Sequence, residues 1–216
     1  INLSLLSELL SIPTFAEIES EMENIDPLKI YKTIDELNHL FGTKLKELLY
    51  FKLQEIEKSL DQVWPEGKNE RKLIETIWKL LLHSNDEEIK CKIIKYVDSS
   101  SMTLAKAALN SFSRINCPER KIISNIFFNK WKNNSVVLDS WFSFNASIEV
   151  DEKTNSIEKL FKNKFFDSKS PNTLRAILNT FVTRNSTFHA VDGSGYKYIA
   201  KKIIDFDKLN PIVISR

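Results

Sequence analysis

The fold class is indicated by residues 26–60, which read DPLKIYKTIDELNHLFGTKLKELLYFKLQEIEKSL. Asp26-Pro27 is a typical helix start, because proline fits the first helical turn. Apolar residues then recur every three or four positions, which is the spacing of one helix face. Gly42 is expected to end the first helix, and Thr43 to begin a second. The two apolar stripes are Ile30, Ile34, Leu37 and Phe41, then Leu45, Leu48, Leu49, Leu53, Ile56 and Leu60.

Similar start signals recur on both sides of this stretch. Thr14 and Glu17 match a capping box, which predicts a short helix to about Glu23. Acidic residues 86–88 favour a helix start through the helix dipole. A further helix is expected from Asn69, with Leu73, Ile77, Leu80 and Leu81 on one face. Others are expected over Met102–Arg114, Ser135–Ser147, Ile157–Asn163, Pro171–Thr183 and Tyr196–Leu209. Another is expected to begin at Cys117-Pro118, with Ile122, Ile126 and Trp131 facing inward.

These helices with short loops predict an all-α fold, in which antiparallel helix pairs stack into an α-solenoid-like superhelical domain. Residues 1–216 are expected to form a single domain. We expect the chain to be truncated at both ends relative to its parent. Ile1 is not an initiator methionine, and the helix signal at Asn210-Pro211 has only begun when the sequence stops at Arg216.

Composition argues against several classes of function. The net charge is +2 from 31 basic and 29 acidic residues, which is too balanced for a protein that binds nucleic acid by neutralising phosphates. Apolar runs are too short for a bilayer span, so we expect no membrane partner. Cys91 and Cys117 are isolated, which is typical of reduced structural thiols, and a cytoplasmic location is expected.

No catalytic or metal constellation is found by residue chemistry alone. A zinc peptidase needs H-E-x-x-H on a helix, but no two of His39, His83 and His189 are four residues apart. We therefore expect no catalytic residues, metal ligands or cofactor in this chain. The aromatic residues lie at helical spacing and are expected in the core.

Residues 185–196, NSTFHAVDGSGY, require an unusual backbone. No glycine occurs between Gly67 and Gly193, and then Gly193 and Gly195 flank Ser194. Positive φ or a close approach would explain them. Both glycines touch the serine, so this is neither a nucleophile elbow nor a dinucleotide loop. We expect a structural motif in which Asp192 or Ser194 caps the last helix. His189 is expected to be a structural histidine rather than a base.

Three segments, in this order and spacing, resemble a known family. They are Ser170-Pro-Asn-Thr-Leu-Arg175, Phe188-His-Ala-Val-Asp-Gly-Ser-Gly-Tyr196 and Asn210-Pro-Ile-Val-Ile-Ser-Arg216. Together they look like the C-terminal helical domain of bacterial-type aminopeptidase N, a zinc-dependent alanyl aminopeptidase. Looser matches at residues 25–27, 71–73, 102–105 and 137–142 extend the resemblance over nearly the whole chain.

This resemblance implies a non-catalytic domain of a zinc metalloaminopeptidase. In the family, zinc and its H-E-x-x-H ligands lie in a separate catalytic domain, which removes N-terminal residues from peptides. The helical domain would cap that catalytic domain of the same polypeptide and restrict entry of peptide substrates. Arg216 matches a family arginine that reaches the substrate chamber, and Arg175 matches one that adds positive potential. The family often has glutamine after the proline of the last segment, whereas this sequence has Ile212.

A different class of function remains open from the residues themselves. A stand-alone α-helical scaffold could bind a protein partner in a concave face, as other solenoids do. The two readings differ in whether a catalytic zinc motif occurs upstream in the parent chain.

Overall fold

The computed structural model describes residues 2–60, 67–148 and 155–207, and this part of the chain is built from α-helices and one 3₁₀ helix, with no strand. The predicted all-α class is confirmed. The chain divides into two compact units. Unit 1 holds residues 1–25 and 29–126, and unit 2 holds residues 26–28 and 127–216. The helix expected at Asn210 lies outside the described residues.

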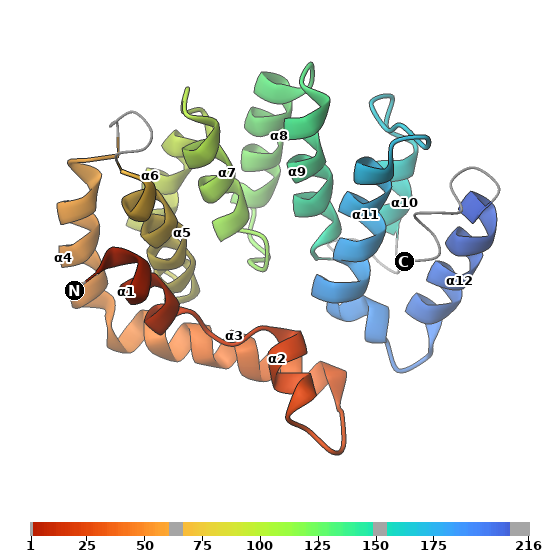
Figure 1. The fold of residues 1–216 in the computed structure, drawn as a ribbon, viewed down its shortest axis with the longest axis horizontal. Helices are drawn as coiled ribbons and strands as arrows, with labels where there is room; N and C mark the ends of the chain where they lie inside the picture. The colour runs from red at the N-terminus through yellow and green to blue at the C-terminus, as the bar shows by residue number, and fades with distance from the viewer. Residues whose placement is uncertain (1, 61–66, 149–154, 208–216) are drawn as a thin grey trace. The chain divides into compact units, whose positions relative to one another are not determined.

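Most of the helices that make up unit 1 are of moderate length (Figure 1). They are α1 (Leu3–Leu10), α2 (Phe15–Ser20), α3 (Pro27–Lys44) from residue 29 onward, α4 (Lys46–Glu57), α5 (Lys68–His83), α6 (Glu87–Val97), α7 (Met102–Ser111) and the first part of α8 (Glu119–Trp131).

Helix α5 is the centre of unit 1. Apolar side chains are buried around most of its circumference, including Leu73, Ile74, Ile77, Trp78 and the run Leu80–Leu82. Helices α1, α4, α6 and α7 all pack against it. A helix that is apolar on nearly every side is stable only when neighbours cover it. The small residues Ala105 and Ala108 of α7 are also fully buried, and they allow close helix packing.

Several helix starts are capped as the sequence predicts. Thr14 and Glu17 form the complete capping box at α2, although this helix ends at Ser20 rather than near Glu23. The Asp86 carboxylate accepts hydrogen bonds from the backbone N–H groups of Glu88 and Ile89 at the start of α6. Each such cap satisfies N–H groups that the first turn leaves without an intrahelical acceptor.

The prediction that Gly42 ends a helix is wrong. Helix α3 continues through Gly42 to Lys44, and the break comes at Leu45. A Cβ atom on Gly42 would overlap the main-chain carbonyl of Leu80. Glycine is needed here because the backbone of α3 crosses directly over α5, and this close approach outweighs the low helix propensity of glycine.

Two predictions of inward-facing residues are also wrong. Leu48 is 68% exposed on α4, and Ile122 is 52% exposed on α8. In α8 the fully buried residues are Ile123 and Phe127, while Ile126 and Trp131 are half-buried. Apolar residues occupy adjacent positions in this helix, so two overlapping stripes are available and the sequence alone does not select between them.

Unit 2 contains the end of α8, three longer helices, a short α10 and a 3₁₀ turn. They are α9 (Ser135–Ala146), α10 (Asn155–Phe161), α11 (Pro171–Arg184), η1 (Ser186–His189) and α12 (Ser194–Asp207). Helices α9 and α11 pack against each other, and α10 contacts both. Their shared core is formed by Leu138, Phe142, Ala146, Ile157, Leu160, Ile177 and Phe181. Aromatic rings surround it, as in the edge-to-face pair of Phe142 and Phe166.

Within the described ranges, no helix combines the length and the apolar character that crossing a bilayer requires.

Candidate functional site

Of the two arginines expected to bind substrate, the structure describes only Arg175. Arg216 and the whole segment from Asn210 lie outside the described residues. Arg175 lies on α11 and is exposed. Its helix face is set by its neighbours, because Thr173 and Leu174 are buried. The Thr173 hydroxyl donates to Oδ1 of Asp139 on α9 at 2.7 Å, which fixes the first turn of α11.

The segment between α11 and α12 is held by one buried asparagine. Asn185 is 1% exposed, and its Nδ2 donates to the carbonyl of Ala146 at 3.1 Å. Its Oδ1 accepts from the backbone N–H of Thr187 at 3.0 Å, which starts the 3₁₀ turn η1. One side chain thus ties this connection to the end of α9 and sets the direction of the chain that follows.

Glycine is required at Gly193 and at Gly195 for two different structural reasons. Gly193 has φ of 70°, the left-handed region that favours glycine. Gly195 is buried in the first turn of α12, where a Cβ atom would overlap the main chain of Phe188. Between them, the backbone N–H of Ser194 donates to Asp192 Oδ1 at 2.9 Å. Through these contacts, the first turn of α12 packs directly against η1.

His189 and Tyr196 meet across this turn. His189 Nδ1 and the Tyr196 hydroxyl share a hydrogen bond of 2.7 Å, and the Tyr196 ring also packs on Phe188 at 4.7 Å between ring centroids. Phe188 in turn contacts Phe181 of the core. All the motif residues from His189 to Tyr196 therefore lie in one turn, and their contacts stabilise that turn.

No group of His, Cys, Asp or Glu side chains in the described ranges is arranged to hold a metal ion. His39 and His83 instead bind main chain. His39 Nδ1 donates to the His83 carbonyl at 2.6 Å, and His83 Nδ1 donates to the Lys79 carbonyl at 2.8 Å. Burial lowers the pKa of His83.

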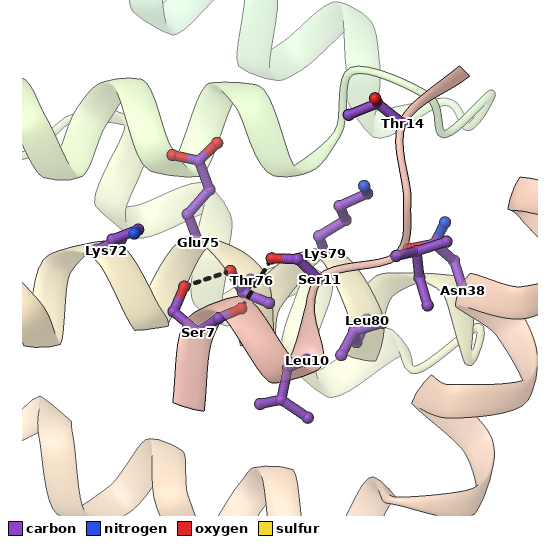
Figure 2. Close-up of a pocket in the computed structure, with 11 residues that line it drawn as sticks. Ser7, Leu10, Ser11, Thr14, Asn38, Lys72, Glu75, Thr76, Lys79 and Leu80 are labelled. Carbon is purple, nitrogen blue, oxygen red and sulfur yellow. Dashed lines mark hydrogen bonds between the residues drawn. The ribbon is translucent and has the colours of Figure 1, made fainter. Parts of the chain in front are cut away.

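The structure shows a pocket in unit 1 that the sequence did not indicate (Figure 2). It has a volume of about 380 Å³. One wall is a single face of α5, and the opposite wall is α1 with the linker that follows it. The lining residues are Lys72, Glu75, Thr76, Lys79 and Leu80 of α5, Ser7, Leu10, Ser11, Ile12 and Thr14 of the opposite wall, and Asn38 of α3. Its formation depends on how three helices cross, which local patterns do not specify.

Hydroxyl groups hold two sides of this pocket together. The hydroxyls of Ser7 and Thr76 lie 3.1 Å apart and join α1 to α5 (Figure 2). Ser11 donates from its hydroxyl to the Ser7 carbonyl at 2.8 Å. At the rim, Lys72 forms an ion pair with Glu8 of α1. The pocket therefore has a fixed polar frame.

The most unusual member of the pocket is Asn38. Its side chain is 0% exposed, and its Nδ2 donates to the carbonyl of Ile34 at 2.7 Å. Its Oδ1 is buried and has no hydrogen-bond partner among the residues that the structure describes. Burying a polar atom without a partner is costly, so this oxygen lowers the stability of the packing around it.

The described residues form packed helices throughout, with one 3₁₀ turn and no strand. A model of the family described as "Domain of unknown function (DUF3458_C) ARM repeats" matches residues 1–216, and the chain belongs to this family. The ARM-repeat description agrees with the predicted solenoid-like stacking of helix pairs.

Curated relatives are enzymes of greater length. Aminopeptidase N of Escherichia coli (strain K12) is 27% identical over 215 residues, which are 99% of this chain and 25% of that protein. Aminopeptidase N of Haemophilus influenzae is 30% identical over 122 residues, 56% of this chain and 14% of that protein. The chain thus spans a quarter or less of the length of these relatives.

A solved structure shows the same fold. A chain of Legionella pneumophila aminopeptidase A, solved in complex with aspartic acid, matches with a TM-score of 0.82 and 27% identity. The match covers 99% of this chain and 26% of that one. The resemblance to the C-terminal helical domain of aminopeptidase N-like enzymes is confirmed.

Proposed function

We propose that residues 1–216 act as one helical domain that caps the catalytic domain of a zinc-dependent aminopeptidase. The parent would hydrolyse N-terminal residues from peptides, and the helical domain would restrict access to the active-site chamber. The observation that carries this proposal is the match of 99% of the chain, at a TM-score of 0.82, to part of an aminopeptidase structure. The same match counts against a stand-alone scaffold.

In this proposal, catalysis and control of access belong to different domains of one polypeptide. Zinc and the catalytic groups would belong to the part that lies outside this chain, so residues 1–216 alone should be inactive. Enclosing a site excludes water and positions a short substrate for attack. Arg216 and Arg175 would add cationic contacts for a peptide carboxylate or carbonyl. The isolated thiols Cys91 and Cys117 agree with a cytoplasmic location.

Substrate size tests the capping role. The full-length polypeptide is assayed on a short peptide and on a stable folded protein that carries the same N-terminal residues. Capping predicts hydrolysis of the peptide and of the unfolded protein, with little trimming of the folded protein. Equal trimming of the folded and unfolded forms would contradict the capping role.

The enzymatic assignment is tested in the same samples. Activity should be lost with a metal chelator and restored by zinc, and purified residues 1–216 should release no amino acid. Absence of peptide hydrolysis by the full-length polypeptide would contradict the aminopeptidase assignment itself.

A further inference from the structure

Helix α1 buries a serine and exposes two leucines, which is the reverse of the usual order. Five of its eight residues are leucine, yet the residue that it buries is Ser7, which is 2% exposed. Leu5 and Leu9 are 55% and 67% exposed. Apolar side chains gain free energy on leaving water and hydroxyl groups do not, so this helix is not arranged to have water on its outer side.

One polar contact shows which side of α1 faces α5. The Ser7 hydroxyl lies 3.1 Å from the Thr76 hydroxyl of α5. Leu5 and Leu9 lie two residues before and two residues after Ser7. With about 3.6 residues per turn, each of them is therefore about 160° around the helix from Ser7. Leu5 and Leu9 form one surface, here named the leucine face, and this face is directed away from α5.

The helices of unit 1 stack in an order that this face would continue. Helix α5 packs against α7, and α1 packs against α5 over a contact of similar extent (Figure 1). Helix α1 is thus the next member of the stack after α7 and α5. The leucine face lies on the side of α1 where a following member of the stack would be placed.

The repeat architecture indicates what covers the leucine face. The chain belongs to a family described as ARM repeats. In such stacks each repeat contacts only its neighbours, and a terminal repeat has a polar outer face that keeps the protein soluble. The outer face of α1 is apolar, so α1 does not have the character of a terminal repeat. The match to Escherichia coli aminopeptidase N covers 25% of that protein, so a parent of similar length has chain to supply another repeat.

We propose that the leucine face binds a further helix pair of the parent polypeptide, namely the repeat that precedes α1 in sequence. The helix that lies on Leu5 and Leu9 carries leucine, isoleucine or valine at intervals of three and four residues, because this spacing forms one apolar helix face. The stack of α7, α5 and α1 then continues by one repeat. The contact goes beyond the proposed function, since it requires no catalytic group.

Photo-leucine tests this contact in the full-length polypeptide. This analogue is close to leucine in size, and on irradiation its diazirine ring loses nitrogen and bonds to the group beside it. The irradiated protein is digested, and cross-linked peptides are identified by mass spectrometry. We expect Leu5 and Leu9 to be joined to a segment that precedes α1 and has apolar residues at helical spacing. Leu73, which is buried in α5, is the internal control and should be joined only to parts of unit 1.

A second copy of the protein is the alternative occupant, and isotopes distinguish it. The irradiated sample contains equal amounts of light and heavy protein, so a cross-link between copies joins one light peptide to one heavy peptide. Mixed pairs at Leu5 and Leu9 would overturn the proposal. Cross-links from these two residues to a segment without helical spacing would overturn it as well, and so would their absence when Leu73 is cross-linked.

A pair of variants provides an independent measurement. Leu5→Asn combined with Leu9→Asn should loosen α1 in the full-length polypeptide, and proteolysis within residues 2–14 should become about tenfold faster or more. Leu48→Asn is the matched control, because Leu48 is 68% exposed on α4 and the same change there should leave cleavage within residues 2–14 unaltered. Unchanged cleavage in the double variant would overturn the proposal. A parent without peptidase activity would refute the proposed function and would leave both measurements interpretable.

Discussion

Gly195, in the first turn of α12, lies directly against the main-chain carbonyl of Phe188, with no space for a side chain between them. This main-chain contact joins the 3₁₀ turn to the last described helix, beside the hydrogen bond between the side chains of His189 and Tyr196. Phe188 also packs on the core residue Phe181, so the position of α12 depends on the core through this glycine.

Gly195→Ala should therefore be strongly destabilising. Its new Cβ would force two backbone segments apart, which we expect to cost about 1–3 kcal/mol of unfolding free energy. Gly193→Ala is the matched control, because it has φ of 70° but open space around it, and it should cost about 1 kcal/mol. Urea denaturation of the purified chain measures both. A smaller loss at Gly195 than at Gly193 would contradict the role of the close approach.

Gly42→Ala should also destabilise unit 1, although alanine is the better helix former by about 1 kcal/mol. The carbonyl of Leu80 occupies the space of the added methyl group, so α3 and α5 must separate. We expect a net loss of about 1–3 kcal/mol in urea denaturation. A gain in stability would show that the crossing relaxes easily, and would refute the packing explanation for this glycine.

Asn185→Ala should cost about 2 kcal/mol, because the Ala146 carbonyl and the Thr187 N–H would both lose their buried partner. Asn172→Ala, at an exposed position of α11, is the control and should change stability little. Thermal unfolding followed by circular dichroism compares the two. Equal melting temperatures would mean that the buried amide contributes nothing to the fold.

The stability of the chain should depend on pH through His83. Burial lowers the pKa of this ring below its ordinary value of 6.5, while the Lys79 carbonyl and Asp35 partly oppose the shift. The unfolded chain thus binds a proton more readily than the folded chain. The free energy of unfolding should therefore be independent of His83 titration above pH 6.5. It should decrease as the pH falls below 6.5, because the unfolded chain takes up the proton first, and level off once the folded ring is also protonated.

This dependence can be isolated by subtraction. His83→Asn retains a donor for the Lys79 carbonyl but does not titrate in this range. The difference in unfolding free energy between the two proteins should therefore change with pH below 6.5 and stay constant above it. A difference that is independent of pH, or one that favours the histidine as the pH falls, would contradict the lowered pKa.

Arg216→Ala in the full-length polypeptide should raise KM for peptides and leave the zinc content unchanged. Loss of a charged hydrogen bond to substrate should reduce kcat/KM about tenfold. Arg175→Ala is expected to have a smaller effect, because only positive potential is lost. Arg184→Ala, at the exposed end of α11, removes the same charge elsewhere and serves as the control. Unchanged kinetics on di- and tripeptides would contradict the role of Arg216.

The helix starts could be predicted from sequence because the contacts that stabilise them form within a single turn. Thr14, Asp86, Ser101 and Ser170 each accept a hydrogen bond from the turn that follows, and short-range chemistry determines this. The positive φ and the close approach proposed for the paired glycines both occur, at Gly193 and Gly195 respectively.

Features that depend on two helices meeting could not be predicted in the same way. Gly42 has the sequence context of a helix end, and only the crossing of α3 over α5 explains why it stays helical. Asn38 occupies a position on the buried face of α3 where an apolar residue would be expected, and its neighbours come from elements far away in sequence. The pocket therefore emerges only with the packed structure.

The burial of Asn185 also decides which covalent modifications the folded chain can accept. Asn185-Ser-Thr187 matches the acceptor sequence for N-linked glycans, and a glycan would be attached through the side-chain nitrogen. That nitrogen donates to the Ala146 carbonyl inside unit 2. A sugar at this atom would exclude the native connection between α11 and α12, so the native fold leaves this sequon closed to an oligosaccharide transferase.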